Sequence, residues 1–276
     1  MLPGGETAAH KRLEAFLAKG LEAYATQRNR LDLAGTSRLS QDLHFGFLSI
    51  RQVWKATEGS GLGPRTYRNE LLWREFAHHL LAEEPRILQE PFRLSFRDFP
   101  WRQDREAWEA WCEGRTGIPT VDASARRLKA EGFVHNRARM VAASFLTKHL
   151  MLDYRWGEAH YLQWLADGDW ACNNLGWQWS AGCGVDAQPW FRVFNPVTQG
   201  RTYDPSGQDI RRWIPELARL PAPWIHAPWE APPSVLAEAG VTLGVTYPWP
   251  IVDLAAARAR FLEEARRVVR SERGSS

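Results

Sequence analysis

The sequence has few of the residues on which disulfide, metal and membrane chemistry depend. Its three cysteines form no C-x-x-C pair, and its eight histidines include no H-E-x-x-H motif. These absences argue against a disulfide framework and a zinc site, and they favour a reducing compartment. No apolar run is long enough to span a membrane, and no secretory signal is visible. We therefore expect a cytoplasmic protein that binds no metal.

An excess of one charge sign and a strand-like alternation of residues are also nearly missing. The chain carries 35 basic and 32 acidic side chains, so a nucleic-acid footprint would have to be a local patch. Its 276 residues, 44% of them hydrophobic, are enough for a sizeable core. We expect an all-α protein with one helical domain over residues 1–276.

Tryptophan, in contrast, is abundant. Its 15 residues outnumber 12 phenylalanines and 6 tyrosines. An indole N–H needs a partner when it is buried, so tryptophan is a demanding way to fill a core. Some of these rings are therefore expected to stack on a ligand or to relay electrons.

Periodicity and capping residues predict most of the helices. The predicted helices cover residues 7–30, 64–84, 104–113, 121–131, 136–151, 156–166 and 253–270. Asp104 and Asn136 are the expected N-caps of two of them, and Gly114 and Gly132 the expected stops. Ser49 begins a capping-box pattern before another short helix. Residues 213–250 are rich in Pro and Trp and predict irregular surface packing.

Residues 167–179, D-G-D-W-A-C-N-N-L-G-W-Q-W, are the most informative stretch. Asp169, Asn173 and Trp177 are spaced four apart, so a helix would place them on one face. An apolar core would leave the carboxylate and the amide unsatisfied, whereas a flat ligand edged with donors and acceptors would satisfy them. The alternative is an exposed capping loop with Trp packed beneath it. Spacing alone leaves both interpretations open.

Four further clusters carry polar chemistry. Residues 35–40, G-T-S-R-L-S, resemble a hydroxyl-rich helix start that can bind an anion, although this segment taken alone favours an ordinary Ser/Thr cap. Glu70, Trp73 and Arg74 share one helical face, either as a surface ion pair or as a binding face. Arg139 beside Met140 suggests a partly buried ion pair. The basic stretch 126–129 is either a solvated face or part of a nucleic-acid footprint.

The 167–179 motif resembles the signature of the flavin-binding domain of the photolyase/cryptochrome family. Other segments agree in the same order: T-S-R-L-S (36–40), N-E-L-L-W-R-E-F (69–76), G-R-T-G (114–117), H-N-R-A-R-M (135–140) and F-R-V-F-N-P (191–196). The match covers most of residues 24–213 and is similar above all to class I cyclobutane pyrimidine dimer photolyases. The family's α/β antenna domain has no counterpart before Tyr24, so we expect it to be absent.

This resemblance implies FAD as the cofactor and light-driven electron transfer from reduced FAD to a flipped-out dimer. The implied cofactor contacts are Tyr24, Thr36, Ser37, Arg38, Leu39, Ser40, Tyr67, Arg74, Asn136, Arg139, Asp167, Gly168, Asp169 and Asn173. It further implies that Arg139 pairs with Asp167. Asn173 matches the neighbour of flavin N5, where many cryptochromes carry Asp or Cys.

The resemblance also implies a lesion pocket and a DNA footprint. The catalytic residues it implies are Glu70, Trp73, Asn136, Met140 and Trp179. The implied DNA contacts are Arg28, Glu70, Trp73, Arg137, Met140, Trp179, Arg192 and Gln199. The expected partner is damaged DNA, bound by a monomer. Two alternatives are a cryptochrome-like light sensor and a flavin-free helical nucleic-acid module.

An electron relay is the last expectation. The family passes an electron along three Trp residues, and Trp177 and Trp101 match its inner and outer members. The middle position falls on Tyr154, and tyrosine is harder to oxidise. We therefore hypothesise a relay Trp177–Trp156–Trp101 with Tyr154 as a bystander or secondary donor. The alternative is that all of these rings only pack.

Overall fold

The computed structural model describes residues 3–187 and 189–273. It is 62% helical, and its only β-features in those residues are isolated bridges such as Arg102–Leu152. The expected all-α class is therefore confirmed. No helix in the described part of the chain combines the length and the apolar character that crossing a bilayer requires.

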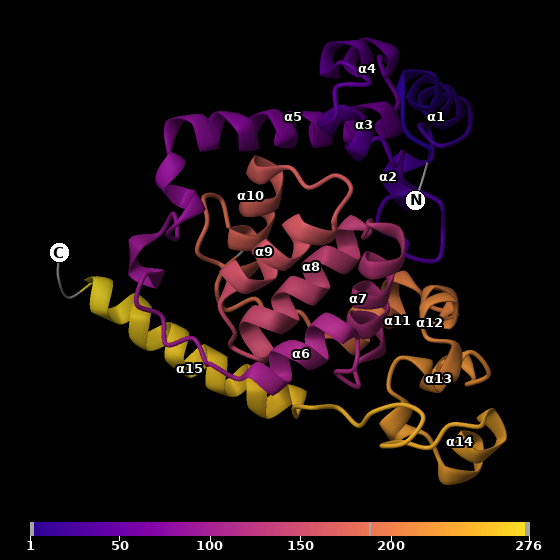
Figure 1. The fold of residues 1–276 in the computed structure, drawn as a ribbon, viewed down its shortest axis with the longest axis vertical. Helices are drawn as coiled ribbons and strands as arrows, with labels where there is room; N and C mark the ends of the chain where they lie inside the picture. The colour runs from indigo at the N-terminus through magenta and orange to yellow at the C-terminus, as the bar shows by residue number, and fades with distance from the viewer. Residues whose placement is uncertain (1–2, 188, 274–276) are drawn as a thin grey trace.

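The helices form three groups along the chain (Figure 1). The first comprises α1 (Glu6–Lys19), α2 (Tyr24–Gln27), α3 (Ser40–His44), α4 (Ile50–Ala56) and α5 (Leu62–Glu83), followed by the short helices η1 (Pro85–Leu88) and η2 (Leu94–Phe96). The second comprises α6 (Arg105–Glu113), α7 (Pro119–Glu131), α8 (Asn136–Ser144), the π-helix η3 (Phe145–His149), α9 (Tyr154–Trp164) and α10 (Trp170–Ala181). The third comprises α11 (Pro196–Tyr203), α12 (Gln208–Trp213), η4 (Pro215–Leu217), α13 (Ala222–Ile225), η5 (Pro228–Glu230), α14 (Pro233–Ala239) and α15 (Leu254–Arg273).

Three predicted helix ends are confirmed by their local geometry. The Asp104 carboxylate accepts a hydrogen bond from the Ala107 N–H at 3.0 Å and so caps α6. Gly114 and Gly132 end α6 and α7 in the left-handed conformation, with φ of 66° and 61°. Glycine adopts this conformation without a Cβ clash, which is why it marks both ends in the sequence.

The predicted helix over 7–30 is wrong, because α1 ends at Lys19 and the chain turns before α2. The turn brings the Leu21 carbonyl against Gly63 of α5, where an added Cβ would lie only 2.1 Å away. This backbone-on-backbone contact requires glycine and replaces a continuous helix by two segments that wrap the start of α5.

Two other predicted helix starts need correction. The N-cap of α8 is His135 rather than Asn136, and its Nδ1 accepts from the Arg137 N–H at 3.1 Å. Helix α9 begins two residues before the predicted position because the Asp153 carboxylate accepts from the Arg155 N–H at 2.9 Å. Ser49 precedes α4 as expected, but its side chain makes no capping hydrogen bond.

Residues 213–250 are not irregular packing, as predicted, but a set of short helices around their own core. This C-terminal core contains Ile210, Ile214, Leu217, Leu220, Ile225 and Tyr247. Proline occupies the first turn of four of these short helices, where its missing N–H costs nothing. The Pro-rich composition thus reflects frequent helix starts.

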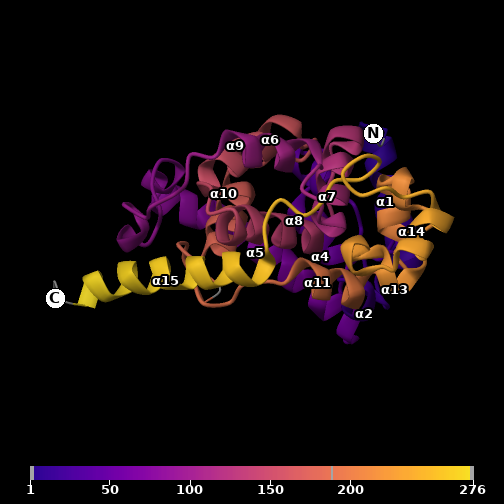
Figure 2. The ribbon, with the colours of Figure 1, turned by 90° about the horizontal axis from the view of Figure 1, so that it is seen from below.

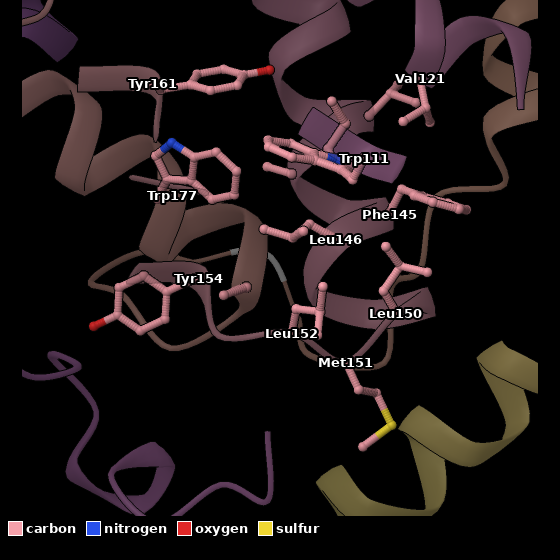
Figure 3. Packing of buried hydrophobic residues seen from close by; sticks show 14 of the residues in the cluster. Trp111, Val121, Phe145, Leu146, Leu150, Met151, Leu152, Tyr154, Tyr161 and Trp177 are labelled. Atoms are coloured by element: carbon pink, nitrogen blue, oxygen red, sulfur yellow. The ribbon is translucent and has the colours of Figure 1, made fainter. Parts of the chain in front are cut away.

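The molecule has two further cores. The N-terminal core packs α1, α2 and α5 through Leu13, Phe16, Tyr24, Tyr67 and Leu71. The central core is built around Trp111, Phe145, Leu146, Tyr161 and Trp177 (Figure 3). Helix α10 packs against α5, α8 and α9 and so joins the N-terminal and central groups. Helix α15 runs along the side of the central group that faces away from α5 (Figure 1), where it contacts η2 and η3. Seen from below, α15 follows one long edge of the molecule (Figure 2).

Candidate functional site: a cavity between α5, α8 and α10

A cavity of about 570 Å³ lies between α5, α8, α10 and the 36–44 segment. This volume is within the usual range for ligand and cofactor sites. Most of the predicted site residues line it: Tyr24, Arg28, Thr36, Ser37, Arg38, Leu39, Ser40, Tyr67, Glu70, Trp73, Arg74, Asn136, Arg137, Arg139, Met140, Asp167, Asp169, Asn173 and Trp179. Residues from five separate parts of the sequence therefore meet at one site.

Asp169 forms a charged corner of the cavity. Its Oδ1 accepts from the Cys172 N–H at 2.8 Å and caps α10. Its Oδ2 lies 3.1 Å from His78 Nε2 and 3.7 Å from Arg74 Nη2. Burial opposes ionisation, but the Cys172 N–H and the nearby His78 and Arg74 side chains outweigh it and lower the pKa of Asp169. The site therefore presents a carboxylate at neutral pH.

Asn173 offers the cavity an acceptor. Its Nδ2 donates to the Glu158 carbonyl oxygen at 3.0 Å, and a carbonyl oxygen can only accept. This contact fixes which way the amide points and leaves Asn173 Oδ1 for a ligand. The neighbouring Asn174 donates to Glu158 Oε1 at 2.9 Å, so both side-chain amides are hydrogen-bonded to the same residue of α9.

The predicted pair of Arg139 and Asp167 is confirmed. Arg139 Nη2 lies 3.0 Å from both carboxylate oxygens, and its Nε donates to the Val134 carbonyl at 2.8 Å. The pair ties α8 to the loop before α10. Gly168 sits in that loop, outside the residues that line the cavity, and donates its N–H to the Leu165 carbonyl.

The hydroxyl-rich segment forms another wall, with two departures from expectation. Helix α3 begins at Ser40 but has only five residues, so its dipole adds little and the hydroxyls supply the donors. Ser37 Oγ is held by the Tyr67 hydroxyl at 3.1 Å. Arg38, with φ of 53°, lies over the Phe133 ring and pairs with Glu131, rather than reaching freely into the cavity.

Buried donors remain without a partner at this site. The Nε atoms of Arg38 and Arg137 are buried and make no hydrogen bond in the structure. A buried guanidinium nitrogen is costly to leave unpaired. Two such donors among the residues that line the cavity fit a ligand with anionic oxygens, and the carboxylate–amide corner fits a polar ring edge. The residues present therefore fit a dinucleotide with a planar head group.

The rim of the cavity is apolar and open. The Trp73 side chain is 46% exposed and meets Phe76 edge-on. Glu70 pairs with Arg28, so the surface pair with Arg74 that the sequence allowed is wrong; Arg74 instead contacts Glu75 and Asp169. Met140 and Trp179 lie on the same cavity surface. The exposed Trp73 indole and the Glu70 carboxylate could together bind a flat ligand with polar edges that enters the cavity from the solvent.

The residues predicted for DNA are only partly gathered here. Arg28 and Arg137 line the cavity, whereas Arg192 and Gln199 do not. Arg192 is exposed, and its carbonyl accepts from the buried Lys148 ammonium at 2.9 Å. In the basic stretch 126–129, Arg126 pairs with Glu216 and Arg127 with Glu131 and Asp209, whereas Lys129 is exposed.

Some cavity residues escaped prediction. Cys172 and Gly176 line the cavity, and with Asp169 and Asn173 they follow the spacing i, i+3, i+4 and i+7. Extending that spacing along the motif would have found them. His44 and Phe133 have no comparable signal, because only the fold brings their segments to the cavity. Trp177, expected on the same face, is instead buried beneath it.

His78, Asp169 and Cys172 offer three metal-ligand atoms within 4.8 Å of one another. Burial raises the pKa of the Cys172 thiol to about 12, so the thiol holds its proton. The Arg74 guanidinium already lies beside Asp169 Oδ2, where a metal ion would bind. The arrangement therefore serves the carboxylate corner, and we assign no metal to it.

The predicted relay residues lie away from the cavity wall. Trp177 is 3% exposed, with ring-centroid distances of 5.1 Å to Tyr161 and 6.0 Å to Trp111 (Figure 3). Trp156 contacts Trp108 at 5.6 Å, and Trp101 contacts Phe99 at 4.3 Å. Tyr154 is buried, and its hydroxyl has no hydrogen-bond partner. The relay Trp177–Trp156–Trp101 remains a prediction.

Fold and cavity together define a helical flavin-binding domain. Residues 67–267 match the family model described as the FAD binding domain of DNA photolyase. The chain belongs to this family, and its cofactor is FAD.

Individual relatives agree with this assignment. The structure of a bacterial class III photolyase from Agrobacterium tumefaciens is 43% identical, with a TM-score of 0.95 over 98% of this chain and 57% of that chain. A deoxyribodipyrimidine photo-lyase of Thermus thermophilus is 45% identical over 96% of this chain and 58% of its own length. Cryptochrome-1 of Arabidopsis thaliana is 40% identical over 92% and 39%. The chain thus spans little more than half of these photolyases.

Proposed function

We propose that this chain carries the catalytic domain of a photolyase that splits cyclobutane pyrimidine dimers in DNA. The observation that carries the proposal is the joining of two sets of residues in one cavity. The inner set, Asp167, Asp169 and Asn173, suits a flavin ring edge. The rim set, Glu70 and Trp73, suits a flat base pair with polar edges. Cofactor and lesion would therefore meet without an intervening layer of protein.

The residues that would hold FAD divide by chemistry. Thr36, Ser37 and Ser40 would face its phosphates, while Asp169 and Asn173 Oδ1 would face the ring. The Arg139–Asp167 pair would fix the loop that carries Asp169. Bound and reduced FAD supplies the light absorption and the transferable electron; the protein supplies binding and orientation.

The rim residues would bind the lesion. In this proposal the exposed Trp73 ring stacks on the dimer and Glu70 accepts a hydrogen bond from its polar edge. Met140 is a flexible side chain that suits an irregular pocket, and Asn136 donates to its sulfur at 3.7 Å. Trp179 completes the apolar wall.

The test is repair of dimer-containing oligothymidylate by the FAD-loaded, chemically reduced protein under light. Recovery of thymine absorbance in the light and not in the dark is the expected result. Full FAD loading with no dimer splitting would show that the repair proposal is wrong.

The alternative is a cryptochrome-like light sensor without repair, and the similarity to cryptochrome-1 supports keeping it. Asn173 argues against it, since the resemblance places Asp or Cys there in many cryptochromes. The same repair assay separates the two functions.

A further inference from the structure

A fully buried lysine lies where α8 continues into the π-helix η3. The Lys148 side chain is 0% exposed, and among the described residues its Nζ pairs with no carboxylate. Lysine is almost never fully buried without a partner. The partner here is the Arg192 carbonyl oxygen, to which Nζ donates at 2.9 Å. The fold therefore buries an amine, despite the cost of desolvating it, to hold one backbone atom of residues 189–195.

The π-helix determines where this amine lies. The Leu150 N–H donates to the Phe145 carbonyl at 3.0 Å, five residues back, and the Arg260 guanidinium of α15 donates to the His149 carbonyl at 3.3 Å. Directly after this turn, Met151 has a left-handed φ of 55°. Such π-turns are rare and frequently occur at functional sites. The turn carries the lysine as a fixed part of the central core.

The segment that the lysine holds presents exposed side chains. Phe191 is 58% exposed, and Arg192 is exposed beside it. Beneath them the backbone is hydrogen-bonded: the Arg192 N–H donates to the Pro189 carbonyl at 2.8 Å, and the Phe194 N–H donates to the buried Ser144 hydroxyl at 3.4 Å. Residues 189–195 therefore have a backbone fixed from below and side chains that face solvent.

This segment lies between the cavity and α11. Val185, a few residues earlier, lines the cavity, and Asn195 caps α11 by accepting from the Val197 N–H at 2.9 Å. Helix α11 also packs against α8, which forms part of the cavity wall. A cation held at this place extends the proposed DNA footprint beyond the cavity itself.

The lysine supplies a hydrogen-bond donor more than a charge. Burial lowers the pKa of Lys148 to about 7, so the amine loses its charge readily near neutral pH. The charged and the neutral amine both carry N–H groups that can donate to a carbonyl. The Phe261 ring of α15, whose centre is 5.7 Å from Nζ, packs beside the amine. The contact with the Arg192 carbonyl therefore does not depend on the charge.

We propose that Lys148 is an internal anchor that places Arg192 for contact with a DNA phosphate. The proposal rests on the proposed function, because it needs DNA as the ligand. The buried amine binds the Arg192 carbonyl, and the guanidinium then meets the phosphate without first ordering residues 189–195. Ordering a segment during binding costs conformational entropy, so an anchored segment binds DNA more tightly.

The test measures binding of an undamaged duplex by the FAD-loaded protein. Methionine fills the space of the lysine stem but donates no hydrogen bond to the carbonyl. Lys148→Met should weaken duplex binding in the wild-type background and not in the Arg192→Ala background, where no guanidinium is left to place. Thr147→Val is the matched control, because it removes a buried hydrogen bond from the same turn without touching residues 189–195. This control should bind the duplex as the wild type does.

A second readout follows the segment itself. Hydrogen exchange, located by mass spectrometry, should become faster at residues 190–195 in Lys148→Met and stay unchanged within residues 240–253. If Lys148→Met folds poorly, Ser144→Ala carries the same test, since it removes the acceptor of the Phe194 N–H. Its effect on duplex binding should be smaller and should again vanish in the Arg192→Ala background.

Three results would overturn the anchor. They are equal weakening by Lys148→Met in both backgrounds, duplex binding that Lys148→Met leaves unchanged, and wild-type duplex binding by Arg192→Ala. Equal weakening would mean that the lysine only stabilises the fold. Failure of the wild-type protein to split dimers in DNA that it binds would count against the proposed function and not against this inference.

Discussion

Asp169 combines two tasks in one side chain. Its Oδ1 caps α10 through the Cys172 N–H, while its Oδ2 faces the cavity with Arg74 and His78 beside it. Several residue types can cap a helix, including the uncharged Ser, Thr and Asn. Only a carboxylate side chain can place an ionised acceptor at this corner of the cavity. The structural and the binding contributions of this carboxylate can therefore be separated by comparison with another Asp cap.

Asp169→Ala should weaken FAD binding by ~1.5–3 kcal/mol, as expected for a charge-assisted hydrogen bond. Asp104→Ala is the matched control, because Asp104 caps α6 in the same way outside the cavity. Both variants should lose about 1 kcal/mol of folding stability. Only Asp169→Ala should lose cofactor affinity in a fluorescence titration of the flavin-free protein. Equal FAD affinity in both variants would show that Asp169 is only a cap.

Trp73 acts at the open side of the same cavity. Trp73→Ala should lower binding of dimer-containing duplex by ~1–3 kcal/mol, the usual value of a base stacked on an aromatic ring. Binding of undamaged duplex should change much less. Trp249→Ala, which also removes an exposed indole, should change neither. Equal losses on both duplexes would count against stacking on the lesion.

At the scale of elements, the interface of α9 and α10 contains a buried carboxyl group. Glu158 of α9 accepts from Asn174 of α10, which also donates to the Ile87 carbonyl of η1 at 2.9 Å. Burial raises the pKa of Glu158 to about 7. The hydrogen bond from Asn174 lowers this pKa, but by less than burial raises it. The folded protein therefore holds a proton on Glu158 at a pH where the unfolded chain has lost it.

The direction of the resulting pH dependence follows from this difference. Because the folded state binds the extra proton, Glu158 makes stability fall as pH rises from the unfolded value of about 4.5 through about 7. Glu158→Gln keeps an acceptor for Asn174 and removes the titration. The variant should match the wild type in urea unfolding at pH 5 and exceed it at pH 8. An equal difference at both pH values would exclude this role for Glu158.

Sequence patterns predicted the end of a helix correctly where a single local residue determines that end. Asp104, Gly114 and Gly132 mark their helix ends, because a carboxylate cap and a left-handed glycine are local requirements. The break after Lys19 was missed because it depends on Gly63, which lies far along the chain. Likewise, Phe145–His149 continues α8 as a π-helix, and no local motif marks that change.

The same distinction applies to the candidate site. Asp167, Asp169 and Asn173 were predicted because one motif carries them, and Arg139 because the family resemblance names its partner. Arg38 lines the cavity as predicted, but the contacts of its guanidinium with Phe133 and Glu131 could not be predicted, because only tertiary packing brings those residues near. The ring contacts of Trp177 were missed for a similar reason, since Trp111 lies on another helix.

For the whole molecule, charge pairing limits nucleic-acid affinity. The net charge is only +3, and many arginines, including Arg126 and Arg127, are already paired with carboxylates. We expect duplex binding with a shallow dependence on salt. Each phosphate contact contributes ~0.9 to the log–log slope.

Arg192→Ala should lower that slope by ~0.9, because Arg192 is exposed and is proposed to contact phosphate. Arg267→Ala removes another exposed arginine, which pairs with Glu263 and Glu264 on α15, and it should leave the slope unchanged. Binding isotherms over a range of potassium chloride concentrations measure both. An unchanged slope in Arg192→Ala would remove this residue from the footprint.

The position of the cavity between two cores couples ligand binding to large-scale opening. Tyr24, Leu39, Tyr67 and Leu71 of the N-terminal core form part of its wall, and Val134 of the central core another part. A ligand in the cavity touches both cores at once, so separating them requires its release. By mass action, opening then becomes less favourable by RT ln(1 + [L]/Kd), where L is FAD. Limited proteolysis between α2 and α4 should slow as FAD is added, in proportion to occupancy, while cleavage within residues 240–253 should not respond. Bound FAD would thus hold the N-terminal and central cores together and slow their separation.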